Sequence, residues 1–164
     1  MAKNLVLYYS ATGTTKAVAE KVAQQLGADM AEIHPITPYS SADLNWYDNK
    51  SRTSIEQHEH NSRVEVVDDF PDLSNYENIL IGHPIWWVIP PRMINATIDT
   101  LDLNGKTLTG FATSGGSSYD RSQSNLARTV EQNGYDLTLN QGAILSNNDR
   151  QISTWLNSLT LNWT

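Results

Sequence analysis

The chain has 164 residues, of which 39% are hydrophobic, and this length and composition predict a single globular domain over residues 1–164. Its formal net charge of −7 argues against nucleic-acid binding, and the absence of cysteine excludes disulfides, thiolate metal sites and cysteine-held iron–sulfur clusters. No run reaches the roughly 18 uninterrupted apolar residues of a membrane span, and no signal peptide precedes the first apolar run. We therefore expect a cytoplasmic protein without membrane contact, in which any electron chemistry comes from a bound cofactor.

The first apolar run, residues 5–9, predicts a buried strand, and a helical period follows from residue 17 to Leu26. Between them lies a turn of small residues, four of which carry a hydroxyl: Ser10, Ala11, Thr12, Gly13, Thr14 and Thr15. The first turn of a helix leaves about four backbone N–H groups unpaired, and the helix dipole makes this end positive. Since hydroxyls and a glycine surround those donors, we predict a loop that binds a ligand's terminal phosphate.

An ordinary helix start is the alternative for this loop, because Ser and Thr are favoured capping residues. Two better-known phosphate loops do not fit. The Gly-Lys-Ser/Thr ending of the nucleoside-triphosphate loop is missing, and so is the glycine triplet of the dinucleotide fingerprint.

Gly27 predicts the end of the first helix, and residues 29–34 read as a short, polar strand at the edge of a sheet. Residues 37–63 are rich in Ser, Asp, Asn, Glu and His and have no clear period, although a helix over 41–58 is possible. A His-x-His pair, His58 and His60, occurs there. We predict a solvated segment and no metal site, because neighbouring side chains on a helix do not face each other.

Residues 78–82 form a continuous apolar run of the kind that a central parallel strand shows. The remaining elements alternate: a helix over 92–101, a strand over 106–112, a helix over 120–132 that stops at Gly134, a strand over 137–145 interrupted at 140–142, and a last helix capped by residues 147–149. Five strands alternating with helices predict an α/β fold, a three-layer sandwich whose parallel sheet has helices on both faces.

Three distinctive loops follow the first, third and fourth of these strands. With the strand order 2-1-3-4-5 these strands are neighbours, and the loops after them converge where such sheets bind ligands. The second loop offers an aromatic surface and the third is rich in glycine and hydroxyls: Pro84, Ile85, Trp86 and Trp87, then Thr113, Ser114, Gly115, Gly116 and Ser117. An aromatic wall beside a phosphate loop suits a planar, phosphorylated cofactor. The alternative for the tryptophan pair is a core or partner surface.

Taken together, the Ser-Ala-Thr-Gly-Thr-Thr, Pro-Ile-Trp-Trp and Thr-Ser-Gly-Gly motifs resemble those of the flavodoxins, single-domain FMN proteins, over nearly the whole chain. The resemblance implies a flavodoxin-like fold with a five-stranded parallel sheet of order 2-1-3-4-5. It implies that residues 10–15 hold the FMN phosphate, that residues 84–87 line the isoalloxazine ring, and that residues 113–117, with Tyr119 nearby, contact its pyrimidine edge.

One departure concerns Val88, which follows Trp87. In relatives a small residue often lies near the flavin N5 atom, where a peptide flip stabilises the one-electron-reduced state. A β-branched residue disfavours a positive φ, so we expect this state to be poorly stabilised here.

The resemblance favours an electron-transfer carrier whose partners are redox proteins or a small acceptor such as a quinone. The main alternative is an FMN-dependent NAD(P)H:quinone-type oxidoreductase, although the sequence shows no recognisable second nucleotide-binding site. A partner-binding module without cofactor and a serine hydrolase fit less well, because the loop hydroxyls are intact and no Ser/His/Asp arrangement is visible. The sequence leaves the oligomeric state open.

Overall fold

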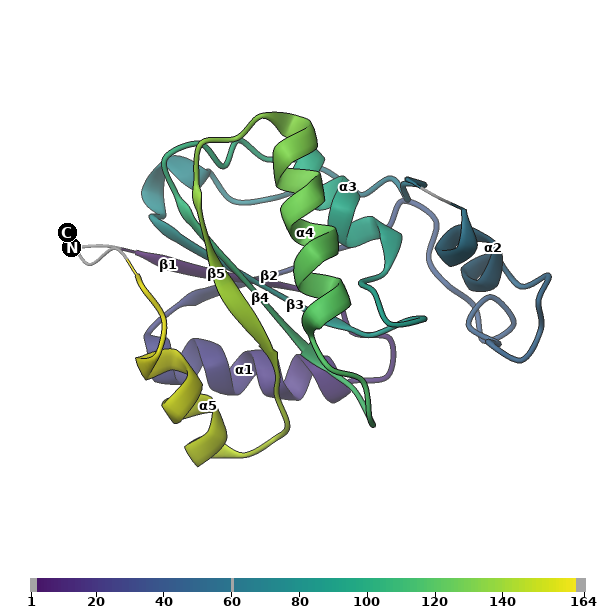
Figure 1. Ribbon diagram of the computed structural model, residues 1–164, viewed down its shortest axis with the longest axis horizontal. Helices are drawn as coiled ribbons and strands as arrows, with labels where there is room; N and C mark the ends of the chain where they lie inside the picture. The colour runs from purple at the N-terminus through teal and green to yellow at the C-terminus, as the bar shows by residue number, and fades with distance from the viewer. Residues whose placement is uncertain (1–2, 60, 162–164) are drawn as a thin grey trace.

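The computed structural model describes residues 3–59 and 61–161, in which five strands alternate with helices (Figure 1). The strands are β1 (Asn4–Tyr8), β2 (Asp29–Glu32), β3 (Asn78–Pro84), β4 (Thr107–Thr113) and β5 (Thr138–Ile144). The α-helices are α1 (Thr14–Leu26), α2 (Arg52–His58), α3 (Arg92–Thr100), α4 (Asp120–Asn133) and α5 (Asp149–Asn157), and a short 3-10 helix covers Leu73–Asn75.

All neighbouring strands are parallel, and their order is β2-β1-β3-β4-β5, which confirms the predicted sheet. In register, Leu7 pairs with Ile81 and Ile81 with Gly110. The strands β1 and β4 are buried along their whole length, whereas β2, at the edge, is largely exposed. This difference explains why the central strands are nearly continuous apolar runs and the edge strand is polar.

Helices cover both faces of the sheet, as expected. In Figure 1, α1 and α5 lie below the sheet, and α3 and α4 lie above it. Val6 and Leu80 point into the core on the α1 side, and Leu7 and Ile81 into the core on the other side. Each of these fully buried side chains contributes about 1.5–3 kcal/mol to the free energy of unfolding.

Several boundaries differ from prediction; β2, for example, ends at Glu32 and not at residue 34. The possible helix over 41–58 is reduced to α2, because residues 41–50 form successive turns. The strands β3 and β4 run on past their predicted ends, to Pro84 and Thr113. The strand β5 continues through residues 140–142, where the predicted interruption is only a shift in its register with β4.

Within the described ranges, 3–59 and 61–161, no helix combines the length and apolar character needed to cross a membrane. The same ranges contain no group of three or more His, Asp or Glu side chains placed to hold a metal ion. His60 of the His-x-His pair lies outside the described residues.

Candidate functional site

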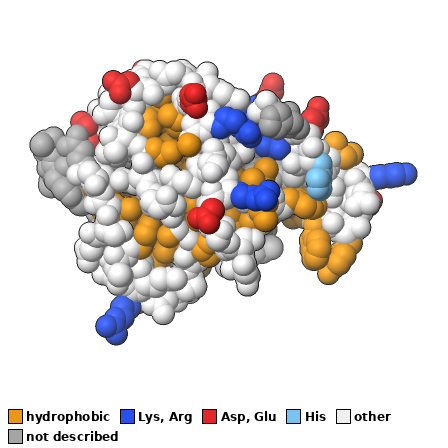
Figure 2. Space-filling view, in the orientation of Figure 1, with side chains coloured by type: hydrophobic (Ala, Val, Ile, Leu, Met, Phe, Trp, Pro, Cys, Tyr) orange, Lys and Arg blue, Asp and Glu red, His pale blue; other side chains and the backbone are white. Residues whose placement is uncertain are grey.

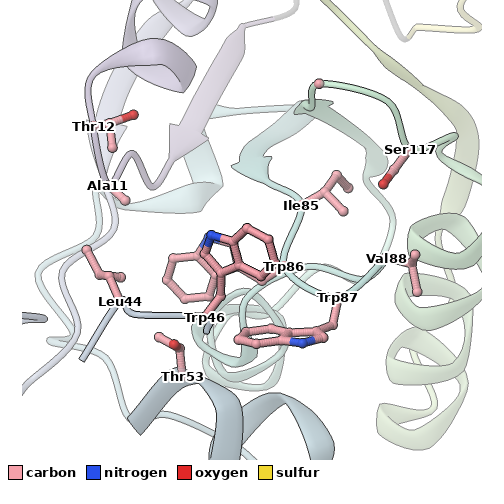
Figure 3. A pocket seen from close by; sticks show the side chains of 11 residues that line it. Ala11, Thr12, Leu44, Trp46, Thr53, Ile85, Trp86, Trp87, Val88 and Ser117 are labelled. Atoms are coloured by element: carbon pink, nitrogen blue, oxygen red, sulfur yellow. The ribbon is translucent and has the colours of Figure 1, made fainter. Parts of the chain in front are cut away.

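A pocket of about 700 Å³ opens at the carboxyl ends of β1, β3 and β4 (Figure 3). It is lined by Ala11, Thr12, Leu44, Trp46, Thr53, Ile85, Trp86, Trp87, Val88, Gly115 and Ser117. The three loops predicted to converge therefore contribute to one cavity. A fourth contributor is the segment 37–63, which supplies Leu44, Trp46 and Thr53.

The first loop presents hydroxyls that the helix start does not use. Gly13 is the N-cap of α1, with φ 94°, and no side chain of the described residues caps the helix. The backbone N–H of Gly13 donates to Ser10 Oγ at 3.0 Å, while the exposed Thr12 and Thr14 hydroxyls face each other at 3.4 Å. Ser and Thr are thus not acting as ordinary caps, and the positive end of α1 is available to an anion.

Thr15 has a different environment from the other hydroxyls. It is buried, and its Oγ1 lies 2.7 Å from Oγ1 of Thr113, which is also buried. This hydrogen bond joins the start of α1 to the end of β4, so the first and third loops are held in a fixed relation.

The second loop is a two-residue hairpin. The N–H of Trp86 donates to the Ile89 carbonyl at 2.9 Å, and the N–H of Ile89 donates back at 3.3 Å. The two residues between them, Trp87 and Val88, have φ of 51° and 63°. The expectation that Val88 would avoid a positive φ is therefore wrong. A two-residue hairpin with a type I′ turn has positive φ at both central residues, and the closing hydrogen bonds impose it on Val88.

Gln57 of α2 fixes this hairpin from outside. Its Nε2 donates to the carbonyls of Trp86 and Pro90, both at 3.0 Å, and its Oε1 accepts from the Arg92 N–H at 3.1 Å. The Arg92 guanidinium in turn donates to the carbonyls of Gln57 and Glu59. The backbone on both sides of the strained pair is thus bonded to α2, which holds it in place.

Aromatic side chains support the inner wall of the pocket. Trp86 packs edge-on against Tyr9 and Tyr39, with ring centroids 5.8 and 5.4 Å apart. The Arg52 guanidinium lies 3.9 Å above the Tyr39 ring. Burial raises the pKa of Tyr9 to about 12, so its hydroxyl stays neutral. A ring packed on two sides presents its remaining surface in a fixed orientation.

The third loop is shaped by Ser114. Its Oγ accepts from the N–H groups of Gly116 at 3.3 Å and Ser117 at 3.0 Å. A side chain added at Gly115 or Gly116 would meet no atom within 4 Å, so the space around both glycines is open, and Gly115 lines the pocket.

Tyr119 packs against the strands β3, β4 and β5. It is buried, its hydroxyl is 3.0 Å from His83 Nε2, and its ring occupies space that a Cβ at Gly110 or Gly142 would fill. His83 Nδ1 donates to the Pro84 carbonyl at 2.8 Å, which leaves Nε2 to accept from the tyrosine. Burial lowers the pKa of His83 to about 4. The pair therefore supports β3, and Tyr119 is not among the described residues that line the cavity.

Other predicted site residues are not among the described residues that line the cavity, although several of them form hydrogen bonds within its loops. They are Ser10, Gly13, Thr14, Thr15, Pro84, Thr113, Ser114 and Gly116. Sequence analysis missed Leu44, Trp46 and Thr53. The one signal available was an aromatic pair, Trp46 and Tyr47, in an otherwise polar stretch.

The profile of the flavodoxin family matches residues 3–159. The chain belongs to the flavodoxin family. A candidate flavoprotein of Bacteroides eggerthii is 39% identical, with a TM-score of 0.90 over 99% of this chain and 100% of the other. One from Bacteroides uniformis is 36% identical, with a TM-score of 0.86 over 96% and 99%. A Lactobacillus acidophilus flavoprotein, solved in complex with FMN, is 23% identical, with a TM-score of 0.69 over 95% and 99%. No curated protein matches the chain.

Proposed function

We propose that this flavodoxin-family protein binds FMN in the pocket and serves as an electron-transfer carrier. The observation that carries the proposal is the convergence of an uncapped, hydroxyl-rich helix start and an aromatic hairpin on one cavity. The solved complex of the Lactobacillus flavoprotein with FMN supports the choice of cofactor.

The residues present fit such a cofactor. The exposed hydroxyls of Thr12 and Thr14, with the N–H groups of the first turn of α1, would hold the phosphate without a lysine or arginine. Trp86 and Trp87 would line the isoalloxazine ring, and the open glycines of the third loop would let backbone groups approach its polar edge.

When bound, FMN supplies reversible electron transfer, and the protein sets its orientation, its access and the local electrostatics. The aromatic wall excludes water from one side of the ring. The net charge of −7 opposes the build-up of negative charge on a reduced flavin in the pocket. This repulsion would lower the midpoint potential of the flavin.

Titration of the purified apoprotein with FMN tests the proposal directly. We expect FMN to bind at micromolar concentration or below. Quenching of tryptophan fluorescence reports the binding, because Trp46, Trp86 and Trp87 all line the cavity. Absence of binding at micromolar FMN would contradict it.

One observation favours a second candidate, an FMN-dependent NAD(P)H:quinone-type oxidoreductase. The exposed Trp46 ring lines the same cavity, which suits a small planar acceptor better than a flat protein surface. Steady-state oxidation of NADPH in the presence of a quinone would support the oxidoreductase over the carrier.

A further inference from the structure

The segment before α2 is held by its own hydrogen bonds. The N–H of Ser40 donates to Asp43 Oδ2 at 2.9 Å, and the N–H of Asp43 donates back to Ser40 Oγ at 3.1 Å. Both the N–H and the hydroxyl of Thr53 donate to the Asp43 carbonyl, and the Ser54 hydroxyl donates to the Asp48 carbonyl at 2.8 Å. The backbone between Asp43 and Asp48 is therefore anchored to α2 at both ends.

This anchored stretch displays two aromatic rings to solvent. Trp46 is 61% exposed and Tyr47 is 79% exposed, and their rings stack at 4.0 Å with an interplanar angle of 27°. Figure 2 shows hydrophobic side chains gathered at the edge of the molecule that carries this segment and α2. Exposed apolar surface on an ordered scaffold is a mark of a contact site for another molecule.

The position of Trp46 relative to the pocket indicates what that molecule is. Tyr47 covers one face of the Trp46 ring, while the Trp46 side chain also lines the cavity together with Trp86 and Trp87 (Figure 3). Trp86 is half-buried against Tyr9 and Tyr39 and forms the inner wall. Trp46, which is mostly exposed, forms the rim, where a flat aromatic molecule entering from solvent would meet it first.

We propose that Trp46 determines acceptor specificity by stacking on a planar electron acceptor of the quinone class that enters the pocket beside the bound flavin. This proposal rests on the proposed function. In the transfer, the quinone takes up two electrons and two protons and becomes the hydroquinone. The reduced flavin supplies them and returns to the oxidised form, and no bond to the protein forms or breaks.

The test uses the FMN-loaded protein, reduced with dithionite under anaerobic conditions and mixed rapidly with menadione. The reoxidation rate as a function of menadione concentration gives an apparent Kd for the quinone. We expect Trp46→Ala to raise this Kd roughly 3- to 10-fold, and Trp46→Phe to restore most of the affinity. Reoxidation by ferricyanide, which has no aromatic ring to stack, is expected to stay unchanged.

Ile55→Ala provides a matched control, since Ile55 is 55% exposed on α2 and does not line the cavity. We expect it to leave both reoxidation reactions unchanged. An unaltered menadione Kd in Trp46→Ala would overturn the proposal. A weakened FMN affinity in the Trp46→Ala variant would overturn it too, because Trp46 would then contact the flavin as part of the cofactor-binding site. Failure of the unmodified protein to bind FMN would instead refute the proposed function.

Discussion

Thr12 and Thr15 lie three positions apart and have opposite environments, one exposed at the pocket and the other buried against Thr113. We expect Thr12→Val to weaken FMN binding by about 1–3 kcal/mol, because it removes a donor to a charged phosphate. Fluorescence titration of the apoprotein with FMN measures this loss. Thr37→Val, at an exposed threonine away from the cavity, serves as the control and should bind FMN normally. Equal FMN affinity in the unmodified protein and both variants would show that Thr12 does not bind the phosphate.

The left-handed backbone of Val88 has a free-energy cost that a glycine would avoid. A left-handed backbone costs a residue with a side chain about 1–2 kcal/mol, and glycine loses about 0.5–1 kcal/mol more backbone entropy on folding. With Val88 at φ 63°, we expect Val88→Gly to raise the free energy of unfolding by about 0.5–1 kcal/mol in urea denaturation.

The control for that substitution is Val67→Gly. Val67 is 40% exposed and Val88 42%, but Val67 is not among the described residues with a positive φ. The same change should therefore destabilise the protein at position 67. Destabilisation of similar size at both positions would show that the hairpin stores no strain at Val88.

Gly13 and Val88 show which backbone conformations can be predicted from the sequence. The positive φ of Gly13 depends on its own residue type and its place before a helix, both of which are visible in the sequence. The conformation of Val88 is not visible in this way, because it is imposed by hydrogen bonds between Trp86 and Ile89 and, through α2, by Gln57. Gln57 lies far from this hairpin along the chain, and so distant a partner leaves no local pattern.

At the scale of elements, α2 holds the hairpin of the second loop in place through one side chain. Gln57 is buried and makes three hydrogen bonds to the backbone of the 86–92 segment. We expect Gln57→Ala to lower the free energy of unfolding by roughly 2–4 kcal/mol, because it removes the buried hydrogen bonds to the Pro90 carbonyl and from the Arg92 N–H. Urea denaturation measures the loss, and faster amide exchange at Ile89 would locate it.

Gln24→Ala is the matched control for that prediction, since Gln24 is exposed on α1. Its effect on stability should be small. If Gln57→Ala behaved in the same way, α2 would not hold the hairpin.

The segment 37–63 was the hardest element to predict. The helix α2 has only seven residues, too few for a clear period, and the turns before it depend on hydrogen bonds between side chains and distant backbone. Its contribution to the pocket, through Leu44, Trp46 and Thr53, follows from tertiary packing alone.

At the scale of the molecule, the sheet was predicted correctly because several signals agreed. The central strands are continuous apolar runs, strands alternate with helices along most of the chain, and right-handed crossovers restrict the topology. The convergence of the three loops then follows from strand order, and so the sequence was enough to locate the pocket edge. The precise lining was not, because side chains such as Thr15 and Tyr119 turn into the core.

The buried His83 links pH to the stability of the whole fold. Burial lowers its pKa to about 4, whereas the unfolded chain takes up the proton near the ordinary value of 6.5. Between these two values the unfolded state binds more protons than the folded state, so the free energy of unfolding falls as the pH is lowered from 6.5 towards 4. The contribution of this one side chain amounts to about 3 kcal/mol over that range.

Substitution of His83 isolates this contribution from that of the carboxylates, which titrate in both proteins. His83→Gln keeps a hydrogen-bonding side chain beside Tyr119 and Pro84 but cannot take up a proton. We expect urea denaturation from about pH 7 to pH 4.5 to show a steeper loss of stability in the unmodified protein than in His83→Gln. Parallel pH profiles for the unmodified protein and His83→Gln would mean that His83 binds its proton equally well in the folded and unfolded states.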